Sequence, residues 1–222
     1  MRGGAGCCLR EPDARWSLGG RAAHRHMAFM LIETELTPNP ATRKFLPGRI
    51  VMDVGTRDFA TPEAAEVSPL ATTLFGLGDV SGVHLGRDFV SVTAAPGADW
   101  TMLQADVASI LADHFAGQMP LFHENLSNGL TVPPEDELAD VEFDPDDADI
   151  VEQISELIET RIRPAVANDG GDIRFRAYRG GEVFLVMQGA CSGCPSSTAT
   201  LKQGIEGLLK HYVPEVIAVH AV

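Results

Sequence analysis

An acidic stretch interrupted by prolines constrains this fold more than any other feature of the sequence. Twelve of the 31 acidic residues lie between Glu135 and Glu159, and no lysine or arginine follows until Arg161. Low hydrophobicity and concentrated like charge cannot offset the entropy that a chain loses on folding, so we expect residues 119–148 to form a flexible acidic linker. A chain of 222 residues divided there is expected to form two small domains, at residues 27–118 and 149–222.

The first of these regions shows the signals of a mixed α+β domain. Ser68 followed by Pro69 predicts the start of a helix that continues to Phe75, with serine as the N-cap. The segments 80–85 and 89–93 read as two strands joined by a short turn, and 100–115 as an amphipathic helix.

The second region has a clear periodicity. Apolar residues recur on one helical face from Ile150 to Ile162, and Pro164 is expected to end that helix. A hairpin is predicted over 173–188, then a second helix over 201–212 and a closing strand over 216–219. The order helix, strand, strand, helix, strand makes this a second small α+β domain.

Charge and motifs exclude several functions. The net charge of −14 leaves no basic face for phosphate binding, so we expect no nucleic acid partner. The longest apolar run near the start, 28–32, is far shorter than a membrane helix, so we expect no membrane partner. Nucleotide-binding and hydrolase motifs are absent, and we expect the protein not to be an enzyme.

Residues 1–26 differ in composition from the rest of the chain. They hold five arginines, two acids (Glu11 and Asp13) and the pair Cys7 and Cys8, with no apolar core of a secretory signal. We interpret them as a leader or as the result of a start codon placed too far upstream, and favour the latter over a mitochondrial transit peptide. Cytoplasmic location in a bacterium is therefore the expectation, with the mitochondrial matrix as the less favoured alternative.

The chemistry of the chain is concentrated at Cys191 and Cys194. The Cys-Ser-Gly-Cys spacing can direct both sulfurs at one point, and the N-terminus of the following helix is expected to favour thiolates, which bind metal. A metal or cluster is favoured over a thioredoxin-like dithiol, because such enzymes place the motif in a longer βαβ fold. Zinc shared by two chains stays open, since sulfur at this spacing does not select the metal.

Two thiolates are half of what a tetrahedral zinc site or a four-iron cluster requires. A second copy of the chain is the simplest source of the other two, which predicts a symmetric homodimer with Cys191 and Cys194 of each subunit around one centre. A centre held in this way between subunits is expected to be exchangeable, which suits delivery.

Two stretches resemble a known family. The run from Ile32 to Gly48 is similar to the start of the Nfu N-terminal domain, and Arg163–Val166, Asp169–Asp172 and Gly189–Leu201 are similar to the NifU C-terminal domain. This resemblance to Nfu-type iron–sulfur scaffold and carrier proteins implies a homodimer that binds a 4Fe-4S cluster through Cys191 and Cys194, with a 2Fe-2S form as a transient alternative. It also implies transfer to apo-proteins, upstream cluster-assembly partners, and an N-terminal domain without cluster ligands that helps to engage targets.

Other polar residues receive structural interpretations. The turn Asp169–Asp172 is expected to act through its geometry, and the seven histidines show no ligand spacing within any one element. Arg174, Arg176 and Arg179 are expected on a solvated strand face, where an acidic client or the acidic linker are their alternative partners.

Overall fold

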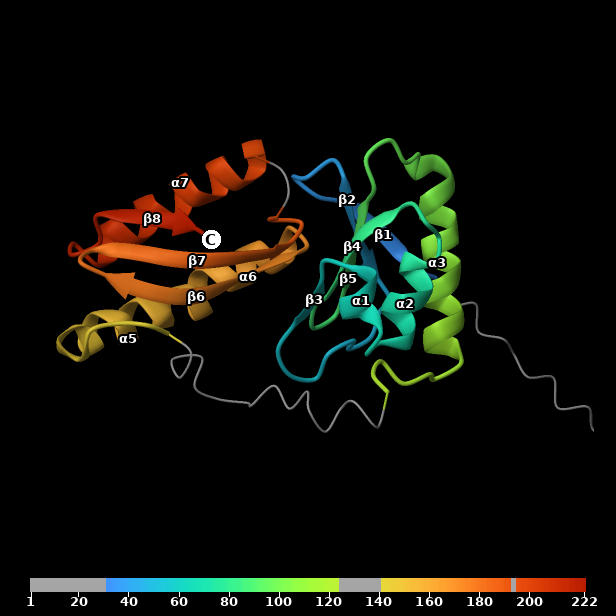
Figure 1. Ribbon diagram of the computed structural model, residues 1–222, viewed down its shortest axis with the longest axis horizontal. Coiled ribbons are helices and arrows are strands. Elements are labelled where there is room, and N and C mark those ends of the chain that lie inside the picture. Colours follow the sequence, from blue (N-terminus) through green and yellow to red (C-terminus); the bar gives the residue numbers. More distant parts are fainter. Residues whose placement is uncertain (1–30, 124–140, 193–194) are drawn as a thin grey trace, which may run out of the picture.

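The computed structural model describes residues 31–123, 141–192 and 195–222. The described chain forms two α+β units, each with its own sheet and its own apolar core (Figure 1). The expected α+β class is therefore confirmed. The predicted leader 1–26 and the centre of the predicted linker lie outside the described residues. No helix in the described ranges is both long enough and apolar enough to cross a bilayer.

The N-terminal unit is built on five antiparallel strands in the order β1-β2-β5-β4-β3. Their bounds are Glu33–Leu36 (β1), Thr42–Leu46 (β2), Arg57–Phe59 (β3), Val80–Leu85 (β4) and Val90–Ala94 (β5). The predicted strand pair of residues 80–93 is thus present as the central β4–β5 hairpin, with Leu85 opposite Val90.

Three helices complete this unit: α1 (Pro62–Ala65), α2 (Pro69–Phe75) and α3 (Trp100–Ala116). Helix α2 begins as predicted, because the Ser68 hydroxyl accepts a hydrogen bond from the Ala71 amide and proline occupies the first turn. The buried residues of α2 and α3 pack on one face of the sheet, against Phe45, Val83 and Val92.

The C-terminal unit has three strands, β6 (Gly171–Arg179), β7 (Glu182–Gly189) and β8 (Ala218–Ala221). The first two form the predicted hairpin, and β8 lies parallel to β7. The closing strand begins two residues later than its predicted start at Val216. A bulge between Phe175 and Ala177 shifts the alternation of β6, so that Tyr178 is buried where the simple pattern placed it outside.

The helices of this unit pack on its sheet. A short 3-10 turn (η1, Pro145–Asp147) leads into α5 (Ala148–Leu157), followed by η2 (Ile158–Ile162) and α6 (Arg163–Asn168), and α7 spans Pro195–Tyr212. Ile154, Ile158 and Ile162 are buried in the core with Leu185 and Leu209.

Pro164 does not end the first helix, contrary to the sequence-based expectation. The chain passes through one π-helical turn at η2 and continues as α6, with Pro164 in the first turn of the new segment. A proline lacks the amide hydrogen that a continuous α-helix would require, and the wider turn accommodates that loss without breaking the helix.

Both described edges of the predicted linker pack on the units beside them. At one edge, Leu121 and Phe122 lie against the N-terminal core, and the His123 amide donates to the Val67 carbonyl. At the other, Val141 is buried in the C-terminal core and Glu142 forms a bridge with Ala177.

Candidate metal centre at the cysteine loop

The cysteine loop connects the end of β7 to the start of α7. Both the Ser192 amide and the Ser192 hydroxyl donate to the Gly189 carbonyl, at 3.1 and 2.9 Å. From within α7, the Thr198 hydroxyl donates to the Cys191 carbonyl at 3.0 Å. These bonds hold Cys191 at a fixed place between strand and helix, whereas Cys194 lies outside the described residues.

Cys191 is 5% exposed, and its sulfur lies over the first residue of β6. A Cβ atom on Gly171 would lie 2.5 Å from the Cys191 Sγ and 2.8 Å from the Gln188 carbonyl oxygen. Only glycine fits at this point of the Asp169–Asp172 turn, so the turn acts through its geometry, as expected.

The electrostatic surroundings of Cys191 differ from the sequence-based expectation. Burial, together with the negative charges of Asp169 and Asp172, raises the pKa of the Cys191 thiol to about 12. The thiol is therefore protonated in this arrangement, although the start of a helix was expected to favour the thiolate. The causes of this shift are burial first and the two carboxylates second.

Asp172 belongs to a buried polar network that sequence reasoning missed. Its two oxygens accept hydrogen bonds from the Arg163 guanidinium at 2.9 and 3.0 Å, and from the Ile173 amide and the Thr56 hydroxyl. Burial alone would raise the pKa of Asp172, but these hydrogen bonds and the Arg163 charge lower it below its ordinary value. The network ties α6 to β6 directly beneath the cysteine loop.

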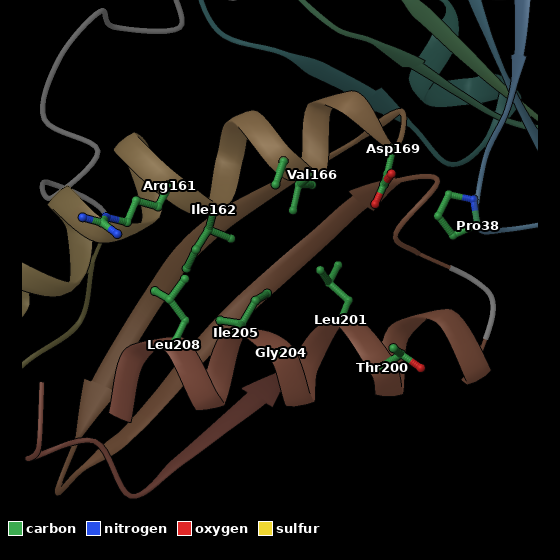
Figure 2. Close-up of a pocket in the computed structure, with 11 residues that line it drawn as sticks. Pro38, Arg161, Ile162, Val166, Asp169, Thr200, Leu201, Gly204, Ile205 and Leu208 are labelled. Atoms are coloured by element: carbon green, nitrogen blue, oxygen red, sulfur yellow. The ribbon is translucent and has the colours of Figure 1, made fainter. Parts of the chain in front are cut away.

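An apolar groove of about 610 Å³ runs between α6 and α7 (Figure 2). Ile162 and Val166 line one wall, and Leu201, Ile205 and Leu208 the other. A much smaller cavity of about 30 Å³, lined by Cys191 and Ala190, shares Pro38, Asp169 and Leu201 with the groove. The groove therefore reaches the cysteine loop at one end.

The remaining polar candidates are placed as follows. His84 and His114 are buried, and His211 packs edge-on against Tyr212. Within the described residues, no three histidine, cysteine or acidic side chains are placed to hold one metal ion. Arg179 pairs with Glu142, so one of the two alternatives for the hairpin arginines, the chain's own acidic segment, has a contact in the structure.

Comparison with known proteins decides the family. A family profile described as scaffold protein Nfu/NifU N terminal matches residues 32–118, and one described as NifU-like domain matches 154–220. A Drosophila virilis protein named as a mitochondrial NFU1 iron-sulfur cluster scaffold homolog is 43% identical over 96% of this chain and 68% of its own length. The chain belongs to the Nfu family of iron–sulfur cluster scaffold proteins. This is the family that the resemblance in the sequence indicated.

Two further similarities are to another Drosophila protein and to a solved structure. A Drosophila ananassae relative of the same name is 44% identical over 87% of this chain, and the chain spans 64% of that relative's length. The solution structure of a NifU-like protein from Saccharomyces cerevisiae has a TM-score of 0.40 and 18% identity, over 43% of this Nfu chain and 87% of its own.

The expected location in a bacterial cytoplasm is wrong. The relatives that this Nfu chain resembles over most of its length carry the word mitochondrial in their names. The expectation rested on the two acidic residues among the five arginines of residues 1–26. Such a composition distinguishes poorly between a targeting leader and a misplaced start codon.

Proposed function

We propose that this chain carries an iron–sulfur cluster as cargo, a 4Fe-4S cluster bound by Cys191 and Cys194 of two copies. The proposal depends on one observation: the NifU-like part of the chain contains just two cysteines, on the loop between β7 and α7. A four-iron cluster requires four thiolates, so one chain supplies half of the ligands.

The shared ligand set explains transfer. Each subunit contributes two sulfurs from a loop at the edge of its fold, so separating the subunits removes half of the cluster's ligands at once. A cluster bound in this manner passes readily to an apo-protein that offers a complete set. Cluster-assembly proteins acting upstream and apo iron–sulfur proteins acting downstream are the proposed partners, and a 2Fe-2S form can precede the cubane.

Anaerobic reconstitution tests the proposal. The full chain is incubated with iron and sulfide, and iron, sulfide and mass are measured on the product. We expect a brown dimer with four irons and four sulfides per two chains, as four thiolates around one cubane require. Cys191→Ala and Cys194→Ala are expected to lose the cluster while retaining the folded monomer. A cluster fully retained by both variants would falsify the ligand assignment.

The same samples separate the two alternatives. A thioredoxin-like protein would reduce insulin disulfides as a colourless monomer, and a zinc-linked interaction module would contain stoichiometric zinc without visible charge-transfer absorption.

We also propose mitochondria as the site of action. The support is the naming of the similar Drosophila proteins and the extent of the match to them. Expression of the full chain with a C-terminal fluorescent tag in insect cells is expected to label mitochondria; a uniform cytosolic signal would contradict this location.

A further inference from the structure

The N-terminal unit docks on the cysteine loop of the C-terminal unit through polar side chains. Five of the eight polar or charged side chains that are buried in the described residues lie where the two units meet: Asn39, Lys44, His84, Ser91 and Asp172. Buried polar groups are unfavourable unless paired, so such a concentration indicates a specific interface.

Strand alternation produces this surface. Phe45, Val83 and Val92 point from the N-terminal sheet into its core, so their neighbours Lys44, His84 and Ser91 point from the opposite face. From the alternation in the sequence alone, this polar face would be expected to be exposed to solvent. In the structure it faces the C-terminal unit, while α3 covers the other side of the sheet (Figure 1).

Most hydrogen bonds of this interface are directed at two turns: 168–172, which lies against the Cys191 sulfur, and 189–192, which contains Cys191. The Ser91 hydroxyl donates to the Gly170 carbonyl at 2.5 Å, and the Lys44 ammonium donates to the Asn168 carbonyl at 3.1 Å. The Asn39 amide donates to the Ser192 carbonyl at 3.0 Å. Conversely, the Gly189 amide donates to the Asp58 carboxylate at 3.0 Å, and that carboxylate also contacts the His84 ring.

Close packing accompanies these bonds at two glycines with positive φ. A Cβ atom on Gly170 (φ +80) would lie 2.8 Å from the Ser91 Oγ, and one on Gly189 (φ +61) would lie 3.0 Å from the His84 Cγ. At these two glycines, the backbone of the C-terminal unit lies in direct contact with side chains of the N-terminal unit, beside the cysteine loop.

In the docked arrangement, the N-terminal unit closes one side of the space beside Cys191. Pro38, from the same turn as Asn39, forms one wall of the small cavity beside Cys191. With about 30 Å³, the cavity has room for about two water molecules. This cavity by itself cannot hold four iron and four sulfide ions. We expect a second chain that brings two further thiolates to Cys191 to need the surface that Pro38 and Asn39 cover.

We propose that the N-terminal unit is an intramolecular cap on the cysteine loop, and that capping and cluster-bound dimerisation are mutually exclusive. The inference rests on the proposed function, since it is the shared cluster that brings a second copy to Cys191. The surface formed by Pro38, Asn39, Lys44, Asp58, His84 and Ser91 binds the loop in the free chain and leaves it when a second copy takes its place.

Hydrogen exchange on the apo-protein tests the cap independently of any cluster. Ser91→Asp places a carboxylate against the Gly170 carbonyl and opens the interface without touching the N-terminal core. The matched control is Ser81→Asp, at an exposed serine of β4. We expect the Gly189 amide to exchange about tenfold faster in Ser91→Asp than in the wild type. In Ser81→Asp it should be unchanged, and the Leu185 amide should be unaffected in both. Equal protection of Gly189 in all three proteins contradicts the cap.

Reconstitution then tests the competition. The cluster-loaded wild type should show the fast Gly189 exchange of apo Ser91→Asp, and Ser91→Asp should load several-fold faster than Ser81→Asp. Protection of Gly189 that persists in the loaded dimer, or equal loading rates, overturns mutual exclusion. If no variant takes up a cluster, the proposed function fails and the competition with it, while the apo measurement still decides whether the cap exists.

Discussion

At the scale of single residues, glycines show how closely backbone and sulfur approach at the candidate site. Gly171→Ala is expected to destabilise the C-terminal unit by about 1–3 kcal/mol, because the new methyl group overlaps the Cys191 sulfur and the Gln188 carbonyl. Urea unfolding followed by circular dichroism measures the change. Gly204→Ala on α7 is the matched control: its Cβ meets no atom within 4 Å, so we expect a gain of about 0.5–1 kcal/mol. A loss of equal size in both variants would contradict this account.

A second residue-scale prediction concerns His114 on α3. Burial lowers the pKa of its imidazole below the ordinary value, and its Nε2 has no hydrogen-bond partner in the part of the chain that the structure describes. Because the folded state disfavours the protonated ring, the stability contributed by neutral His114 is present above the ordinary histidine pKa and is lost as the pH falls through it.

The His114→Leu variant isolates this effect. Its urea midpoint should fall less between pH 7.5 and pH 5.5 than that of the wild type, since every other group that titrates in this range is common to both proteins. Parallel pH profiles for the two proteins would show that His114 does not contribute.

The Asp172 network gives the third prediction, since it joins a helix to a strand beneath the cysteine loop. Arg163→Met removes the guanidinium that Asp172 contacts through both oxygens and leaves a carboxylate that is 3% exposed. Removing one partner of a buried ion pair is expected to cost about 3–5 kcal/mol. The double variant Arg163→Met/Asp172→Leu should recover much of this loss in thermal unfolding, because no uncompensated charge remains. A double variant no more stable than Arg163→Met would contradict this assignment.

At the scale of whole elements, start signals and alternation were enough to predict helices and strands that follow local rules. Helix α2 starts at its serine cap, and β4 and β5 have the predicted partners. Among the elements that were not predicted, β3 and α1 are three and four residues long, too short to show a period. The passage through Pro164 was also missed, because proline usually ends a helix and the π turn that carries the chain past it has no signal in the sequence.

The cysteine loop was found from spacing, but its surroundings were not. Cys191 lies against a turn twenty residues earlier in the sequence and next to a turn from the other unit, and no local sequence pattern predicts contacts over such separations. The polar face that carries Lys44, His84 and Ser91 has the same alternation as a solvated strand face. What covers such a face depends on the tertiary structure.

At the scale of the whole molecule, the cap and the second copy differ in how they depend on concentration. The cap is part of the same chain, so its effective concentration is on the order of millimolar at any dilution. A second copy must instead come from solution. If both proposals hold, the N-terminal unit covers the cysteine loop in dilute apo-protein, and the iron–thiolate bonds of the shared cluster are what hold the proposed dimer together against it.

This difference predicts how a loaded dimer releases its cluster. On dilution the subunits separate, and in the wild type the N-terminal unit covers Cys191 again before they can recombine. Cluster loss, followed by the decay of charge-transfer absorption after dilution in the presence of a chelator, should be faster in the wild type than in Ser91→Asp, and Ser81→Asp should match the wild type. Equal decay rates in all three proteins would mean that recapping does not compete with recombination. A slower decay in Ser91→Asp would indicate that the N-terminal unit, which contains no cysteine in residues 27–118, sets the direction of transfer.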